Sequence, residues 1–374
     1  MGSAYTPGLR VSPDIVIRKT RRLPLKGQVM VKVGDRVVPE TPVARTELPG
    51  SAQVVRAAQT LGVEPRALAP LLRKRVGDAL EKNELIGETK SFFGLFRTAL
   101  NAPVAGTIEA ISDTTGNITV REPPIPVEVP AYVRGIVVEV LPEEGVVVET
   151  RGALIQGIFG VGGERQGALR LVVSGPGEAL DEDRVPADAA GQILVGGSLV
   201  TGGALRRAAE AGAAGIVAGG IIDRELVAYL GHDIGVAITG HEEIPLTLVI
   251  TEGFGEIRMA ERTFHLLRSL EGRQASVNGA TQIRAGVIRP EVVVPLAEGE
   301  AAAAPTPQDE GLLEIGTRIR VIREPYFGRL GRVAALPPEP QPIPTDARVR
   351  VLEAELDTGE RVLVPRANVE IIQE

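Results

Sequence analysis

Three glycine-rich loops in the middle of the chain carry residue types that could hold a small anion. The loops read GGSLVTGG, GGIID and TEGFGE, and each follows a short aliphatic run. Backbone N–H groups at the start of a helix bind phosphate and carboxylate groups. The candidate ligand-binding residues in these loops and in two later ones are Thr201, Gly202, Asp223, His241, Thr251, Glu252 and Arg284. They suggest a pocket for a phosphorylated or carboxylated ligand, in which Thr251, Glu252 and His241 could do acid–base work.

The same residues have a purely structural interpretation. Glycine permits the tight turns that join a strand to a helix, and Thr201 and Asp223 are ordinary N-cap residues. A further cluster, Gly160, Gly162 and Gly167, precedes ALRLVV, a predicted strand where the dinucleotide fingerprint requires a helix. That cluster therefore indicates turns. For the three central loops, no P-loop lysine is present, and the ligand pocket and the capping interpretation both stay open.

A second group of candidate residues lies near the end of the chain, where arginine alternates with isoleucine and valine. The candidate binding surface consists of Arg318, Arg320, Arg323, Tyr326, Phe327, Arg329 and Arg332. A row of arginines on one strand face could neutralise phosphates, and the two aromatic residues could stack on bases or fill a protein pocket. Alternatively, the arginines form cross-strand pairs with acidic residues on a solvated face, and Phe327 packs in a core.

The composition excludes several kinds of reactive site. The chain has no cysteine, which excludes disulfides, iron–sulfur clusters and cysteine nucleophiles. Only three histidines are present. The sequence shows no Ser-His-Asp order of a catalytic triad and no pair of carboxylates at a spacing typical of acid–base catalysis. We expect no cofactor and no metal site, and a binding protein is favoured over an enzyme. With a net charge of −7, a protein partner is favoured over naked nucleic acid.

No targeting or membrane segment is expected. The first residues lack the apolar core of a signal peptide, and no later run approaches the ~18 apolar residues of a membrane span. We therefore expect a cytoplasmic protein with no membrane partner. The sequence does not predict its oligomeric state.

The candidate ligand loops belong to a segment, residues 175–295, that alternates strands and helices. Strands are predicted at 193–195, 216–218 and 246–250, and helices at 204–211, 224–230 and 258–270. Gly212 and Gly231 follow two of the helices, as is typical of helix ends. Such short strand–helix–strand spacing predicts a parallel sheet with helices on its faces, a small α/β domain.

The remaining segments differ from the α/β segment in composition and in the elements they predict. Residues 1–174 hold many short Val/Ile runs broken by Gly, Pro and Asp, which predicts a β-rich region, with a helical insertion expected at about 52–82. Residues 296–312, with AEGEAAAAPTPQ, have the composition of a linker. Residues 313–374 form the last predicted domain. The expected fold is thus multidomain α+β, with a β-rich first domain, an α/β domain and a C-terminal β domain.

Two stretches of the first segment carry a resemblance. VKVGDRV in Gly27–Arg45 and APVAGTI in Asn101–Val120 are similar to the two halves of a biotinyl/lipoyl-type barrel-sandwich hybrid. With LPL at residues 23–25, they resemble the N-terminal part of the C subunit of Rnf-type electron-transport complexes. VGDALEKNELIGE, at residues 76–88, echoes the first half. The resemblance implies a barrel-sandwich hybrid, and it does not carry electron transfer, because there are no cysteines for clusters.

The last segment carries a more specific resemblance. GTRIRVIREPYFGRLGRV, which starts at Gly316, and the closing VPRANVEII are similar to the KOW domain of NusG-type transcription factors and several ribosomal proteins. The resemblance implies an SH3-like β-barrel. It also implies a partner of the class that such domains bind, namely ribosomal RNA, ribosomal proteins or RNA polymerase.

Two functions follow from these observations. The first is a non-enzymatic adaptor that docks through its KOW barrel to a larger assembly, of the transcription or translation machinery by resemblance, with RNA or ribonucleoprotein contact through the first hairpin. The second is a small-ligand sensor or enzyme with its site at the α/β strand-end loops. The second requires those loops to converge in an open cleft, and the first is favoured if another domain covers them.

Overall fold

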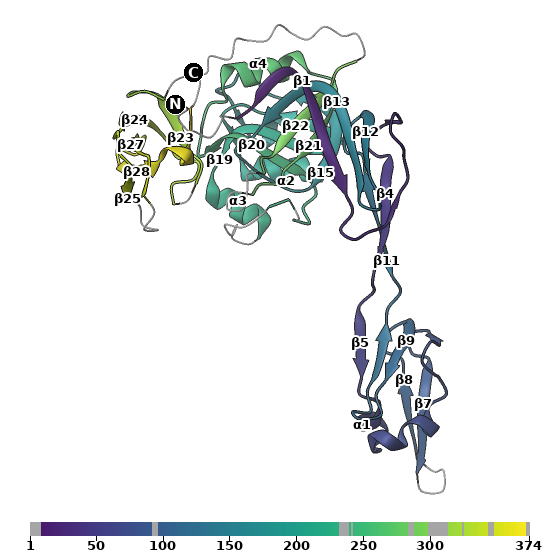
Figure 1. Ribbon diagram of the computed structural model, residues 1–374. Coiled ribbons are helices and arrows are strands. Elements are labelled where there is room, and N and C mark those ends of the chain that lie inside the picture. The colour runs from purple at the N-terminus through teal and green to yellow at the C-terminus, as the bar shows by residue number, and fades with distance from the viewer. Residues whose placement is uncertain are drawn as a thin grey trace.

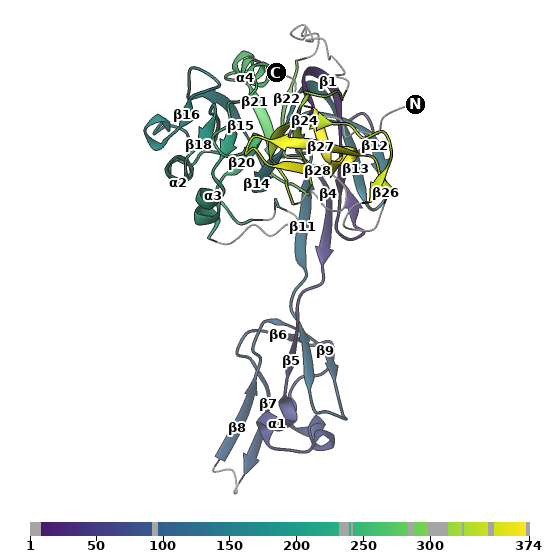
Figure 2. The same ribbon diagram turned by 90° about the vertical axis from the view of Figure 1, so that its left-hand side faces the viewer.

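The chain folds into several β-sheets, so the expected β-rich character is confirmed (Figure 1). The computed structural model describes residues 9–91, 96–231, 239–240, 242–282, 288–297, 313–323, 325–342 and 348–371. A large body built on a 13-stranded sheet, here called the central sheet, carries a projecting arm of residues 52–121 and a separate C-terminal sheet (Figures 1 and 2). No helix in the described part of the chain is long and apolar enough to cross a membrane.

The parallel part of the central sheet matches the predicted α/β segment. Its strands are β15 (Glu164–Leu171), β17 (Gln192–Val195), β19 (Gly215–Ile221) and β20 (Thr247–Phe254), and each pairs in parallel with the next. Two short strands, β16 (Ala179–Leu180) and β18 (Leu199–Val200), join β19 in parallel as well. The three predicted helices are present as α2 (Gly202–Glu210), α3 (Asp223–Leu230) and α4 (Glu261–Ser269). The predicted parallel pairing is therefore confirmed.

Helices cover both faces of this parallel part because each face is aliphatic. Buried residues of α2 and α3 pack in one core with Leu194, Ile216 and Ile250. Buried residues of α4 pack in another with Val217 and Val249 on the opposite face. A 3-10 turn, η3 (Glu182–Arg184), precedes β17.

Antiparallel strands extend the same sheet in both directions. On one side β14 (Phe159–Val161) pairs with β20. On the other, the hydrogen-bonded order from β15 runs through β21 (Gln274–Asn278), β22 (Glu291–Pro295), β13 (Gly145–Gln156), β12 (Gly135–Leu141) and β3 (Arg36–Val37), with β1 (Val11–Arg22) also paired to β13. The sheet is continuous across residue 174, where a domain boundary was predicted, because β21 and β22 return to bridge the two segments.

The arm contains short strands and few helical residues. Its elements are β5 (Ala52–Val55), α1 (Ala57–Leu61), η1 (Pro65–Ala67), η2 (Ala69–Leu71), β6 (Ala79–Leu80), β7 (Leu85–Ser91), β8 (Phe96–Asn101), β9 (Gly106–Ile111) and β10 (Ile118–Arg121). The expected helical insertion at 52–82 is thus reduced to one five-residue helix and two 3-10 turns. Pro65 and Pro70 explain this, because proline interrupts a helix interior. Leu61, Leu68, Leu71 and Leu72, whose spacing suggested a helix, instead pack in the arm's own core.

The two halves proposed for one barrel-sandwich hybrid do not pair with each other. Gly27–Arg45 contributes β2 (Gln28–Val29), β3 and the start of β4 (Pro42–Leu48), and its turn bonds to β12, with Gly34 N to Val137 O at 2.8 Å and Val137 N to Asp35 O at 2.9 Å. Strand β4 also pairs with β11 (Ile125–Pro130), and β2 with β4. The partner of the first half is therefore the segment around residue 137, not Asn101–Val120.

The arm holds a second copy of the same arrangement. Gly77 N donates to Ile108 O at 2.8 Å, and Ile108 N donates to Asp78 O at 3.0 Å. The aspartate side chain closes the turn identically in both copies, since Asp35 accepts from Lys32 N and Asp78 from Arg75 N. The predicted echo at residues 76–88 thus pairs with Asn101–Val120, and the arm repeats the turn-and-strand pairing of the two segments that flank it.

The C-terminal sheet contains the strands expected for the last segment. They are β23 (Arg318–Val321), β24 (Leu330–Ala335), β27 (Val351–Leu356), β28 (Arg361–Pro365) and β29 (Val369–Ile371), all antiparallel in the order β28-β27-β24-β23-β29. A 3-10 turn, η4 (Arg366–Asn368), links β28 to β29, and β25 (Gln341–Pro342) pairs with β26 (Arg348–Val349). Among the described residues the sheet is an open path with its own aliphatic core.

Candidate functional site

Arg320 connects the two groups of candidate residues inside the molecule. Its side chain is only 2% exposed, although it was predicted to lie on a binding surface. Its Nη2 donates to Glu252 Oε2 at 2.7 Å, and its Nη1 donates to Glu370 Oε1 at 2.8 Å and to the Thr251 carbonyl at 3.3 Å. Glu252 lies on β20, and Glu370 lies on β29. A predicted surface arginine and a predicted ligand-binding glutamate therefore form one buried ion pair.

Further contacts complete this junction between the two sheets, which we define as Glu252, Arg289, Arg320 and Glu370. Arg289 Nη2 donates to Glu370 Oε2 at 3.0 Å, and Ala260 N donates to Glu252 Oε1 at 3.1 Å. Burial, the largest influence, lowers the pKa of Arg289, and the neighbouring Glu370 opposes that shift. Each carboxylate oxygen of the two glutamates is thus engaged, and the charges are balanced.

Apolar packing surrounds the junction. Ile322 is buried in the core of the central sheet, and Phe327 packs against the same core. The backbones meet closely, because a Cβ added at Gly253 would lie 3.0 Å from Gly328 O. The C-terminal sheet therefore covers the end of β20, beside which Figure 1 shows it. Core packing, the structural alternative for Phe327, is confirmed.

The other residues predicted to form the C-terminal binding surface differ in exposure and in their polar partners. Arg318 makes a bidentate pair with Asp357 at 2.7 and 3.1 Å, and Arg332 Nη1 contacts the Gly316 carbonyl at 3.4 Å. Tyr326 packs partly against the core of its own sheet, and Arg323 is half-buried. Arg329 is exposed, and its side chain has no polar partner among the described residues. Arg332 and Arg361 lie opposite Glu355, one on each neighbouring strand, which supports the alternative of cross-strand charge pairing.

The helix starts proposed for anion binding already hold internal partners. Thr201 Oγ1 accepts from Ala204 N at 3.1 Å, so Thr201 is the expected N-cap. Gly202 N donates to Glu225 Oε2 at 2.7 Å, so a carboxylate from α3 occupies the anion position of α2. Asp223 is not the cap of α3, because Ile222 takes that place without a side-chain bond.

The remaining ligand candidates do not complete a cleft. Thr251 is buried, and its Oγ1 donates to the Ala218 carbonyl at 3.3 Å. His241 and Arg284 lie outside the described residues. Glu252 and the Thr251 carbonyl face the junction, whereas Thr201 caps α2 and Gly202 binds Glu225 of α3, so the described members of the predicted set do not share one cleft.

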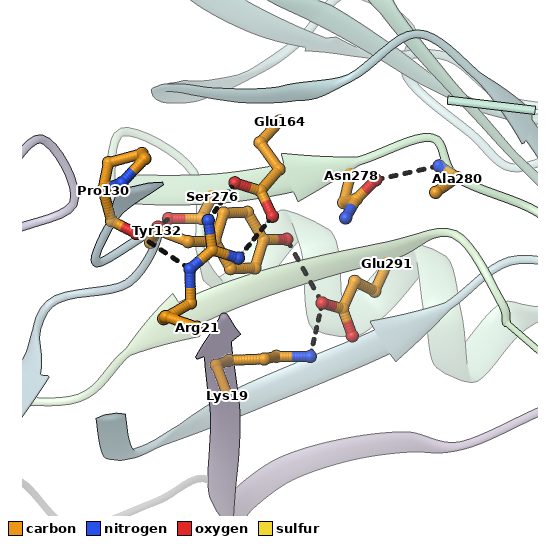
Figure 3. A network of polar contacts seen from close by, with 9 residues as sticks. All are labelled: Lys19, Arg21, Pro130, Tyr132, Glu164, Ser276, Asn278, Ala280 and Glu291. Carbon is orange, nitrogen blue, oxygen red and sulfur yellow. Dashed lines mark hydrogen bonds and ion pairs between the residues drawn. The ribbon is translucent and has the colours of Figure 1, made fainter. Parts of the chain in front are cut away.

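A polar network that the sequence did not suggest lies between β1 and the antiparallel strands of the central sheet (Figure 3). Arg21 makes a bidentate pair with Glu164 at 2.6 and 2.7 Å and donates to the Pro130 carbonyl at 2.8 Å. Lys19 pairs with Glu291, which also accepts a bond from Tyr132 OH at 3.2 Å. Two cations and two carboxylates thus surround one tyrosine, and the charges cancel.

Tyr132 occupies a strained position at the centre of this network. Its φ is +70°, in the left-handed region that a bulky residue rarely adopts, and its side chain is 1% exposed. Ser276 Oγ donates to the Tyr132 carbonyl at 2.6 Å, and the Tyr132 N–H donates to the Pro39 carbonyl at 2.9 Å. Lys19 and Arg21 lie 5.9 and 5.4 Å from its ring centroid, where cations are attracted to the aromatic face. These contacts hold the strained turn in place.

Burial raises the pKa of Tyr132 well above its ordinary value, and the charges of Glu291 and Glu164 raise it further. The folded chain therefore keeps this phenol neutral where an unfolded chain ionises it. The stability that this provides is complete below pH ~10 and declines as the pH rises towards the folded-state pKa.

We expect Tyr132→Phe to leave the alkaline titration of the folded chain unchanged. Tyrosinate absorbance of the native wild type and of the variant should rise equally, and the wild type should gain one extra ionised tyrosine only after unfolding in guanidinium. A native variant that titrates one tyrosine fewer than the wild type near pH ~10 would show that Tyr132 is accessible and ionises normally.

A groove opens beside this network at the boundary between the β1/β12/β13 region and the ends of β21 and β22. Two cavities, of about 680 and 440 Å³, share Val38 and Arg134 in their walls and so form one groove. Ser276, which holds Tyr132, lines the smaller cavity. The strained turn at Tyr132 leads directly into Arg134, so the network fixes the backbone that supplies the groove's shared arginine.

Sequence reasoning missed the network and the groove. The network's residues come from five distant segments, the groove adds others, and single charged residues in β strands carry no local signal. The sequence shows the repeated Gly-Asp turn, but it does not show which strand each turn pairs with. Neither any protein-family model nor any curated protein sequence matches the chain.

Proposed function

We propose that the chain is a non-enzymatic adaptor that docks to a larger macromolecular assembly. The observation that carries this proposal is the junction, where Arg320 and the C-terminal sheet cover Thr251 and Glu252. A sensor or enzyme built on the strand-end loops would need those groups open to solvent. Instead, they serve to fix one sheet against another, as expected of a chain that presents surfaces in a defined arrangement. We propose the cytoplasm as its setting.

The C-terminal unit is proposed as a KOW-type SH3-like domain. Five antiparallel strands with a 3-10 turn before the last strand support this, as does the pairing of β29 with β23. The sequence resemblance to KOW domains points to the transcription or translation machinery as the class of partner. Likewise, the duplicated turn-and-strand arrangement supports the proposal that the arm is a barrel-sandwich hybrid.

The proposed docking face centres on Arg329 and Arg332, which are exposed, with Tyr326 half-buried in the same hairpin region. Arg320 and Phe327 do not belong to it, since they face the central sheet. Glu355 on the neighbouring strand lies opposite Arg332 and offsets part of the positive charge, although it also pairs with Arg361. A protein surface is therefore the favoured partner, and RNA within a ribonucleoprotein is the other possibility that the test distinguishes.

The double variant Arg329→Glu/Arg332→Glu tests the docking face. Tagged wild-type chain should recover a defined large complex from lysate of its source organism, and the double variant should recover at least tenfold less, because opposite charge at the face repels the partner. Arg66→Glu, an exposed charge reversal on the arm, is the matched control and should recover as much as the wild type.

Nuclease treatment separates the two partner classes. Complex that persists after nuclease supports a protein partner, and complex lost after nuclease supports RNA. Equal recovery by the wild type and the double variant would contradict docking through this face.

A further inference from the structure

The groove arises where two strands that share a partner stop short of each other. Strand β12 pairs with β13 only up to Glu149, and β22 pairs with β13 only from Gly152 onward. The larger cavity lies over this break, lined by Gly135, Ile136, Glu149, Thr150 and Arg151. The smaller cavity continues it past Arg134 to the end of β22 at Pro295. The result is a groove within the size range of protein ligand sites.

The groove has an apolar wall that is open to solvent. Val16, Val38, Ile136 and Val138 line the larger cavity and are 57, 51, 40 and 37% exposed. They come from β1, β12 and the end of β3, so they form one contiguous surface although they are distant in sequence. Clustered exposed aliphatic residues of this kind mark interaction surfaces in monomeric chains.

The charged residues of the groove are mainly basic. Arg36, Arg134, Arg151 and Arg273 line it, against the acidic Glu40 and Glu149. Glu149 is already paired with Arg18 and Arg151 with Asp14, each at 2.7 Å, which weakens the influence of both on a ligand and leaves Arg36, Arg134 and Arg273 against Glu40. Arg134 is exposed and lines both cavities, and its side chain has no polar partner in the part of the chain that the structure describes. A basic groove on a chain of net charge −7 favours an acidic ligand.

We propose that this groove binds an extended segment of a partner protein that alternates acidic and aliphatic side chains. The aliphatic side chains would cover Val16, Ile136 and Val138, and a carboxylate would pair with Arg134. Nucleic acid fits less well, because stacking on bases needs aromatic side chains and none lines either cavity. Strands β1, β12 and β13, whose residues line the groove, lie at the opposite end of the body from the C-terminal sheet (Figure 1), so the groove is an interface separate from the proposed docking face.

The probe is a fluorescein-labelled ten-residue peptide of alternating glutamate and leucine, titrated against the full chain by fluorescence anisotropy. We expect saturable binding that weakens as salt is raised, since the charge contact is exposed. A peptide with lysine in place of every glutamate should bind at least tenfold more weakly. A labelled single-stranded oligonucleotide should bind more weakly than the acidic peptide.

Two variants place the binding in the groove. Arg134→Glu should weaken the acidic peptide at least tenfold and strengthen the lysine peptide, because it reverses the groove's exposed charge. Ile136→Ser/Val138→Ser should weaken both peptides, because it removes the shared apolar wall. Both changes affect exposed residues, and the circular dichroism of the variants should match the wild type.

The controls separate this proposal from docking through the C-terminal sheet. Arg66→Glu and Arg329→Glu/Arg332→Glu should bind the acidic peptide as the wild type does. The proposal is overturned if no saturable binding occurs up to about 1 mM peptide, if Arg134→Glu leaves the affinity unchanged, or if the oligonucleotide binds more tightly than the peptide.

Discussion

Arg320→Met should lower the free energy of unfolding by about 3–5 kcal/mol, because it leaves Glu252 and Glu370 buried without their shared cation. The two carboxylates lie within 2.8 Å of the guanidinium, and their side chains are at most 10% exposed. Burying an unpaired charge costs more than the pair itself contributes, so the effect should exceed that of losing a surface pair. Guanidinium unfolding followed by circular dichroism measures it.

Two matched variants identify the cause. Arg318→Met removes an arginine from the same strand whose partner Asp357 is 50% exposed, and it should cost at most about 1 kcal/mol. Arg289→Met/Arg320→Met/Glu252→Leu/Glu370→Leu removes all four charges of the junction together and should restore much of the loss. If Arg320→Met and Arg318→Met cost the same, Arg320 is not a buried link between the sheets.

Tyr132→Ala should lower the free energy of unfolding by about 3–5 kcal/mol, the cost of removing a large buried aromatic side chain. The substitution also removes the ring on which Lys19 and Arg21 pack and the hydroxyl that donates to Glu291. Tyr132→Phe keeps the ring and should cost only about 1.5 kcal/mol. Denaturant unfolding of the three chains under one condition gives the ranking.

The backbone of Tyr132 supplies an internal control. At φ +70°, glycine is free of the steric penalty that any residue with a Cβ suffers. Tyr132→Gly should therefore be more stable than Tyr132→Ala by about 1 kcal/mol, the reverse of the order in a regular strand. If alanine were the more stable, residue 132 would not be strained, and the network would not be what fixes the turn.

Local sequence patterns predicted the elements of the α/β segment because those signals are local. The apolar spacing of α2 and α3 and the glycine after each lie within one element, and β17, β19 and β20 are short aliphatic runs between turns. Parallel pairing then follows from chain connectivity. Thr201 was predictable as a cap for the same reason, since its partner is three residues away.

Pairing between distant strands was not predictable in the same way. Two nearly identical Gly-Asp turns, at Gly34 and Gly77, compete for two similar partner strands, and nothing in one sequence says which turn takes which strand. The predicted domain boundary at residue 174 falls within one continuous sheet, for a related reason. Strands β21 and β22 belong by sequence position to the α/β segment, but they pair with β15 and β13, which both precede residue 174.

The buried position of Arg320 was also beyond a local pattern. Alternation of Arg with Ile and Val indicates one solvated face and one buried face, and Arg318 and Arg320 share the polar face. That face becomes interior at Arg320 only because a second sheet covers it with Glu252. A pattern of period two records which residues share a face, but it does not record what packs on that face.

The C-terminal sheet lies at one end of the body, β1, β12 and β13 lie at the other, and the arm extends from β4 and β11 (Figure 1). The junction fixes the C-terminal sheet to the parallel strands, and the polar network fixes the turn at Tyr132 beside β1 (Figure 3). Each buried polar cluster is balanced in charge and serves to position a surface. This arrangement fits an adaptor better than an enzyme, whose charged groups would face an open site.

Hydrogen exchange of the chain, alone and bound to the assembly that it recovers, tests the adaptor proposal most directly. We expect slower exchange on binding in β24 and the hairpin around Arg329, with β20 and the starts of α2 and α3 unchanged. Slower exchange confined to the starts of α2 and α3, with β24 unaffected, would contradict the account and place the functional site at the strand-end loops.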